Sequence, residues 1–163
     1  GHDHLLRAFS RVVRRIPEAR LLLIGDGPLE SDIRALVKAL ALDTNVIFTG
    51  AQRNIPEHLS IIDVFVLAST RESFPLSARE AMANGVPVIA PAIGGCGEVV
   101  ADGVSGFLFE SANERDLESK MIQMSEDAVR KSCAKASLER ATRLFGVDQW
   151  VEGDEEIYLR FLS

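Results

Sequence analysis

Residues 64–90 read VFVLASTRESFPLSAREAMANGVPVIA and contain two apolar runs with a helical pattern between them. The first run, 64–68, is short and rich in β-branched and aromatic residues, which favours a buried strand. Residues 76–84 show the helical pattern, and the Gly85 that follows is typical of a helix end. A second strand is predicted at 87–90. This order of strand, helix and strand is typical of parallel sheets, whose neighbouring strands need a crossover connection.

The same alternation extends over most of the chain. Strands are predicted at 20–24, 45–48, 64–68, 87–90 and 106–109, and helices at 4–15, 29–42, 57–61, 76–84, 97–101 and 114–125. After residue 125 the pattern is helical only, through Leu144 and again over 148–162. Residues 1–163 are therefore expected to form a single α/β domain. Its core would be a doubly wound, Rossmann-like parallel sheet, with an all-helical C-terminal extension from about residue 126 to residue 163.

Composition narrows the class of protein. With 163 residues, 47% of them hydrophobic and 26% charged, the chain has the make-up of one globular domain. No apolar run approaches the roughly 18 residues of a membrane span. The net charge of -6 argues against a nucleic-acid partner. Cys96 and Cys133 lack metal-ligand spacing, so no metal is expected, and two cysteines without a disulfide framework suit the cytoplasm.

The segment from Glu72 to Glu80 carries the candidate site. Pro75 is expected at the first helical position, where its missing N–H is no loss. The next three N–H groups would point out of the helix start, where hydrogen bonds and the helix dipole stabilise a phosphate. Since carboxylates do not bind phosphate, the two glutamates would serve hydroxyl groups beside it, and phosphate with hydroxyls is the chemistry of a nucleotide sugar. The alternative is a solvated helix with two surface glutamates.

These residues resemble the donor-binding half of the retaining glycosyltransferases of family 4, also called group 1, which have the two-domain GT-B fold. The signature of that family is a Glu, seven residues, a second Glu, Ala-Met-Ala, a small residue, Gly and Pro-Val. In this chain it stands as Glu72, Glu80, 81–83, Gly85 and 87–88. Further matching blocks lie at 22–28, 45–50, 63–67, 94–95, 98–100, 102–103 and 106–108, so the resemblance covers residues 1 to about 110.

The resemblance implies a role for each residue of the site. Glu80 would accept hydrogen bonds from the two ribose hydroxyls, and Glu72, the candidate catalytic residue, would face hydroxyls of the donor sugar. Backbone N–H groups would hold the sugar and the distal phosphate. The expected donor-binding residues are Glu80, Ser73, Phe74, Pro75, Leu76, Ser77, Gly25, Gln52 and Arg53. Pro75 stands where many members have glycine, which removes one N–H. Arg79 is expected to face solvent.

Two glycine-containing turns supply the more distant candidates. Residues 25–28, Gly-Asp-Gly-Pro, lie between a strand and a helix, but Glu30 occupies the third glycine position of a dinucleotide fingerprint, which disfavours NAD. The resemblance places Gly25 along the donor cleft, and a plain tight turn is the alternative. After Gly50, backbone groups of Gln52 would read the base edge while Arg53 would lie against its face. An ordinary surface turn would have the same sequence.

The resemblance also concerns what precedes the first residue. In the family, an Arg and a Lys that neutralise the leaving diphosphate come there, together with one strand of the sheet and the acceptor-binding domain. That strand normally lies between those of Leu22 and Val66. Without the intervening strand, these two strands could pair directly or be separated by a strand-wide gap. We expect the gap, because the flanking helices fix the distance between the two strands.

The expected function is donor binding in the transfer of a sugar from a nucleotide diphosphate sugar to a glycan or lipid acceptor, with no cofactor. The full enzyme would act in the cytoplasm, at the membrane face. This chain alone is expected to be inactive and to associate with itself through unpaired strand edges. One alternative is a non-catalytic module that binds a nucleotide sugar or a protein. Other GT-B enzymes, such as sugar-nucleotide epimerases, lack the paired-Glu block.

Overall fold

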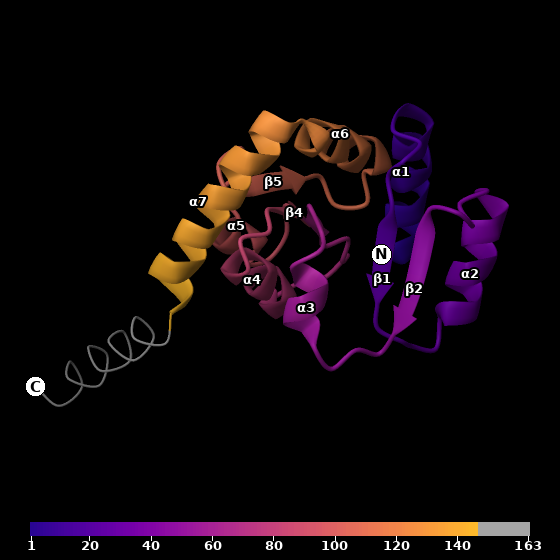
Figure 1. The fold of residues 1–163 in the computed structure, drawn as a ribbon, viewed down its shortest axis with the longest axis horizontal. Coiled ribbons are helices and arrows are strands. Elements are labelled where there is room, and N and C mark those ends of the chain that lie inside the picture. The colour runs from indigo at the N-terminus through magenta and orange to yellow at the C-terminus, as the bar shows by residue number, and fades with distance from the viewer. Residues whose placement is uncertain (147–163) are drawn as a thin grey trace, which may run out of the picture.

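The computed structural model describes residues 1–146. Helices and strands alternate along them (Figure 1) in the order α1 His2–Arg15, β1 Leu21–Ile24, α2 Glu30–Ala39, β2 Val46–Gly50, α3 Ile55–Leu59, β3 Phe65–Val66, α4 Leu76–Ala83, β4 Val88–Pro91, α5 Cys96–Val99, β5 Gly106–Phe109, α6 Glu114–Ser125 and α7 Asp127–Phe145. Each strand and helix predicted before Leu144 is present. The helix predicted over 148–162 lies outside the described residues. Within residues 1–146, no helix is long and apolar enough to cross a membrane.

The strands pair in parallel, as expected, but they form two sheets. β1 pairs with β2, with Leu22 opposite Ile47. β3, β4 and β5 form the second sheet, in which Ile89 of the middle strand lies opposite Val66 and Phe107. The described strands β1 and β3 do not pair with each other. Of the two arrangements considered for them, direct pairing is therefore wrong, and separate strands are observed.

Helix α1 joins the two sheets through its apolar face. Leu5 and Ala8 pack in one core cluster with Ile89 and Phe107 of the second sheet, and Leu23 of β1 lies against the same cluster. Other residues of the helix, Leu6, Phe9 and Val12, are buried in a second cluster that is shared with α2 and β2. The apolar residues recur every three or four positions, so both groups fall on the buried side of one helix. Figure 1 shows α1 beside β1 and reaching α6.

Helices α4 and α7 cover the second sheet and support the segment that carries the candidate site. Ala78, Ala81 and Met82 of α4 share a core cluster with Val88 of β4 and with Ala141 of α7. α4 ends as predicted at Gly85, whose φ of 73° is the left-handed conformation that glycine adopts readily. All four residues of β4 are buried, as suits the middle strand of the second sheet. The position of α4 is therefore determined by tertiary packing on both sides.

Candidate functional site

The loop from Leu67 to Pro75 connects β3 to α4 and contains the first candidate residues. Glu72 is half-buried, Ser73 and Phe74 are exposed, and Pro75 is buried. Pro75 was predicted to occupy the first helical position, and this prediction is wrong. It is the residue before it, with φ -69° and ψ 108°, so its ψ is extended and α4 begins at Leu76. Helix boundaries commonly differ by one residue from sequence expectation, because the hydrogen-bond pattern decides them.

The start of α4 offers free backbone donors. The N–H groups of Leu76, Ser77 and Ala78 donate to no acceptor within residues 1–146. The first N–H of the helix that donates a hydrogen bond belongs to Arg79. Its acceptor is the Pro75 carbonyl, 3.4 Å away. Unpaired N–H groups together with the positive end of the helix dipole favour an anion at this place.

A pair of glycines packs directly against this loop. The Gly95 N–H donates a hydrogen bond of 2.7 Å to the Ser73 carbonyl. A Cβ atom at Gly95 would lie only 2.4 Å from that oxygen, and one at Gly94 would lie 1.8 Å from the Glu72 carbonyl oxygen. Side chains at either position would displace the loop. In the sequence this glycine pair is one of the blocks that resemble the family, with no role indicated, and a Gly-Gly pair after a strand is the signal of such a close approach.

The two glutamates lie in different surroundings. Glu80 is exposed on α4, one turn beyond the helix start, whereas Glu72 is half-buried. Neither carboxylate forms an ion pair with another of the described residues. Burial raises the pKa of the Cys96 thiol, and the nearby Glu72 carboxylate raises it further. Cys96 therefore stays a neutral thiol and is no activated nucleophile, while both carboxylates can accept hydrogen bonds from a ligand.

Arg79 was expected to face solvent, and this expectation is wrong. Its side chain is half-buried, and the guanidinium carbon lies 4.5 Å from the centre of the Phe74 ring. An arginine over an aromatic face is a stabilising cation–π arrangement. The pattern of α4 alone gave no signal of this contact, because Phe74 lies before the helix.

The second group of candidates lies where β1 and β2 end. The Gly25 N–H donates to the Gly50 carbonyl at 2.9 Å, and both glycines have positive φ, 122° and 66°. The side chain of Gln52 donates to the Thr49 carbonyl at 2.7 Å, so it closes its own turn. Arg53 is exposed. The two glycine turns are thus brought together, and the backbone around Gln52 remains the part that could contact a ligand.

The two groups of candidates lie toward the same side of the molecule. Gly1 packs against the end of β3, because a Cβ atom at Gly1 would lie 1.6 Å from the Ala68 carbonyl oxygen. Helix α1 leads away from this point, and β1 then returns along it. Figure 1 shows β2, the parallel neighbour of β1, pointing toward the end at which α1 begins. In parallel α/β proteins, ligands bind at the carboxyl ends of the strands.

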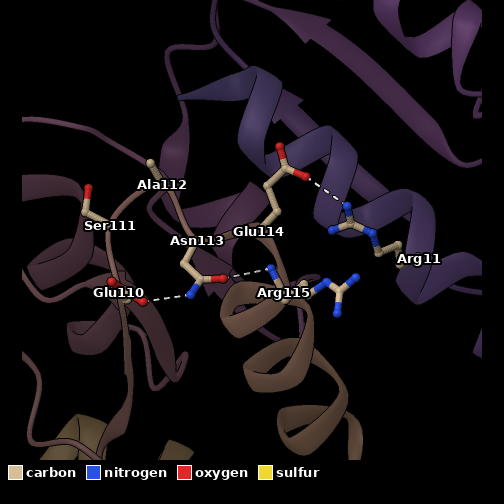
Figure 2. A pocket seen from close by; sticks show the side chains of 7 residues that line it. All are labelled: Arg11, Glu110, Ser111, Ala112, Asn113, Glu114 and Arg115. Carbon is tan, nitrogen blue, oxygen red and sulfur yellow. Dashed lines mark hydrogen bonds and ion pairs between the residues drawn. The ribbon is translucent and has the colours of Figure 1, made fainter.

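Two hollows of about 440 and 460 Å³ lie elsewhere, between α1 and α6. Figure 2 shows three interactions among the polar groups that line the first of them. Arg11 contacts Glu114 at 3.0 Å, and Asn113 accepts a hydrogen bond from the Arg115 N–H and donates one to Glu110. This hollow is shallow, and its paired groups join two helices. We therefore place the candidate site at the loop before α4, where donors and carboxylates are free. Within residues 1–146, no three His, Cys, Asp or Glu residues gather as metal ligands.

Comparison with known proteins assigns the family. The family model "Glycosyl transferases group 1" matches residues 1–140. N-acetyl-alpha-D-glucosaminyl L-malate synthase of Bacillus anthracis is 36% identical over 155 residues, which cover 94% of this chain and 40% of that protein. The chain belongs to the group 1 glycosyltransferases.

Solved structures match the fold closely. HepE from Anabaena, crystallised with UDP and glucose, gives a TM-score of 0.89 at 26% identity, over 98% of this chain and 45% of HepE. The C-terminal domain of the group 1 glycosyl transferase LpcC from Francisella tularensis gives 0.83 at 26% identity, over 90% of this chain and 80% of that domain. The chain thus spans less than half of the synthase and of HepE. The expected fold class, α/β and half of a GT-B enzyme, is confirmed.

Proposed function

We propose that this chain binds the donor, a nucleotide diphosphate sugar, for a retaining glycosyltransferase that acts on a glycan or lipid acceptor. One observation carries the proposal: the free N–H groups at the start of α4 lie, in the sequence, between Glu72 and Glu80, whose carboxylates form no ion pair within residues 1–146. This arrangement suits a phosphate flanked by hydroxyl-bearing groups. The crystal structure of HepE with UDP and glucose supports the same ligand chemistry for a fold of this kind.

The proposed roles follow from the surroundings of each residue. Glu80 accepts hydrogen bonds from the ribose hydroxyls, and Glu72, set deeper in the loop, faces the sugar. Leu76 and Ser77 hold the distal phosphate through their N–H groups, so the site needs hydrogen-bond donors rather than a metal ion. On the other sheet, the backbone around Gln52 reads the base, and Arg53 covers its face.

Sugar transfer itself also requires groups that bind the acceptor and stabilise the leaving diphosphate. The chain matches 40% of the Bacillus anthracis synthase and 45% of HepE. We propose that the acceptor site and the neutralising cations of the full enzyme lie in the part of such proteins that this chain does not match. Residues 1–163 alone would then not catalyse sugar transfer.

Thermal unfolding of the 163-residue chain with UDP-glucose, UDP-N-acetylglucosamine and GDP-mannose tests donor binding. A ligand that binds only the folded state raises the melting temperature with concentration, by mass action. We expect at least one of these ligands to do so, and Glu80→Ala to reduce that shift. No shift with any of them would contradict donor binding. A full-length protein that binds the donor without transferring sugar would instead favour the non-catalytic alternative.

A further inference from the structure

Phe74 belongs to the candidate loop, but burial does not hold its ring in place. The side chain is 41% exposed. Two side chains from helices contact the ring instead. Arg79 of α4 lies over its face at 4.5 Å, and Phe145 of α7 meets it edge to face, with 6.0 Å between ring centres and an interplanar angle of 82°. The orientation of this loop side chain therefore depends on the two helices.

Arg79 connects the two rings. Its guanidinium carbon also lies 5.8 Å from the centre of the Phe145 ring. The Nε atom of Arg79 is buried and has no hydrogen-bond partner within residues 1–146. A buried N–H without an acceptor is costly, and the contacts of the guanidinium with the two rings are favourable interactions that offset this cost. We call these three residues the Phe74–Arg79–Phe145 stack.

The same loop is also held by backbone contacts. Gly95 donates to the Ser73 carbonyl, and its backbone approaches so closely that an added Cβ atom would lie 2.9 Å from the Phe74 ring. The loop is thus held through its backbone by the glycine pair and through its side chain by the stack. Phe74 lies only two residues before Leu76, the first of the free N–H groups, so the stack acts close to the place where a phosphate would bind.

We propose that Arg79 and Phe145 are positioning residues for the candidate loop before α4, and that the end of α7 sets the direction in which the free N–H groups of α4 point. The inference rests on the proposed donor binding, since the ligand of those N–H groups is the donor phosphate. Neither residue needs to touch the ligand. A change at the end of α7, distant in sequence, alters donor affinity because it releases the Phe74 ring and with it the backbone of the loop.

Binding of a nucleotide sugar to four variants of the 163-residue chain tests this proposal. Arg79→Met removes the cation, and Phe145→Leu removes the ring without changing charge, so a purely Coulombic effect on the phosphate would appear only in the first. Phe145→Tyr keeps the ring. Lys120→Met is the matched control, because Lys120 of α6 makes a similar contact, 5.5 Å from the Phe107 ring of β5, and neither residue belongs to the candidate loop. The probe is whichever of UDP-glucose, UDP-N-acetylglucosamine and GDP-mannose stabilises the parent chain most.

We expect calorimetry to show affinity weakened roughly 3- to 10-fold in Arg79→Met and Phe145→Leu, the range of a lost cation–π or aromatic contact. Phe145→Tyr and Lys120→Met should bind like the parent chain. A merely structural role of Phe145 would lower the melting temperature and leave affinity for the folded protein unchanged. Unchanged affinity in both stack variants would therefore overturn the proposal.

Hydrogen exchange of residues 73–78 without ligand provides an independent measurement. The proposal expects faster exchange of these amides in Arg79→Met and Phe145→Leu, and unchanged exchange in Phe145→Tyr and Lys120→Met. If no nucleotide sugar binds the parent chain, donor binding fails while this measurement still decides whether the stack positions the loop. Exchange at the parent rate in all four variants overturns the positioning role, whatever the ligand.

Discussion

At the scale of single residues, Glu72 and Glu80 show how position separates two side chains of the same type. Glu80 projects from the surface of α4, while Glu72 lies half-buried beside the buried Cys96. A carboxylate on an open helix face can accept hydrogen bonds from the two adjacent hydroxyls of a ribose. A carboxylate set deeper in the loop can reach only the part of a ligand that enters it. The proposed division between nucleotide and sugar follows from this difference.

Substitution of each glutamate tests the division of roles. Glu80→Ala is expected to weaken UDP or GDP binding by roughly 1.5–3 kcal/mol, the worth of hydrogen bonds to a charged group. Glu72→Ala should leave the bare nucleotide unaffected and weaken only nucleotide sugars. Calorimetry with both ligand types measures this, and Glu139→Ala on α7 is a control for the loss of one negative charge. Equal loss of bare nucleotide binding in both glutamate variants would contradict the assignment.

At the scale of secondary structure, a side-chain cap anchors the start of α6, and an ion pair joins that helix to α1. Asn113 precedes α6, and its side-chain oxygen accepts from the N–H groups of Arg115 and Asp116, both at 3.1 Å. The first residue of that helix, Glu114, contacts Arg11 and His4 of α1. The cap thus holds the end of α6 that meets α1, which in turn joins the two sheets.

Removal of this cap has a calculable cost. Asn113→Ala is expected to lower the free energy of unfolding by about 1 kcal/mol, because two helix N–H groups lose their acceptor. Asn113→Asp keeps an acceptor oxygen and should retain most of the stability. Urea unfolding of both variants measures the difference, with Ser119→Ala on the exposed side of α6 as the control. An alanine variant as stable as the parent chain would show that the cap contributes nothing.

At the scale of the whole molecule, the two sheets share core clusters but no strand pairing. Within residues 1–146, β1 pairs only with β2 and β3 pairs only with β4. Each of these two strands therefore has one edge that pairs with no other strand of the described residues. Apolar residues of both strands, including Leu23 and Val66, lie against one common cluster that also contains Leu5 of α1. The packing of α1 thus replaces strand pairing as the link between the two sheets.

Free strand edges favour association between copies of a chain. The 163-residue chain is expected to form dimers or larger species in a concentration-dependent manner, and to transfer no sugar on its own. Sedimentation velocity and a transfer assay measure the two outcomes. Ile61→Ser, which removes an apolar side chain that is 73% exposed, should leave association unchanged if edges cause it. A monodisperse monomer would contradict edge-driven association, and an active one would also contradict the need for further cations.

Much of the fold could be predicted because it depends on neighbouring residues. Short apolar runs gave the strands β1 to β5, and the glycine after Asn84 gave the end of α4, since both report local backbone preferences. The loop before α4 was predicted as the candidate site for the same reason: a strand end, a proline and two glutamates follow one another directly. Two local expectations for this segment were wrong: Pro75 lies one residue outside the helix, and Arg79 is half-buried against Phe74.

The sequence by itself thus determined which elements form, their order and the residues that line the loop before α4. The tertiary structure decided what depends on contacts between distant residues. The way the two sheets are held together follows from the packing of α1 against residues of both, and the fit of Gly94 and Gly95 against the loop requires the backbone of β4 and its following turn. Arg79 lies between Phe74 and Phe145 for the same reason, because no local pattern shows that α7 ends beside this loop.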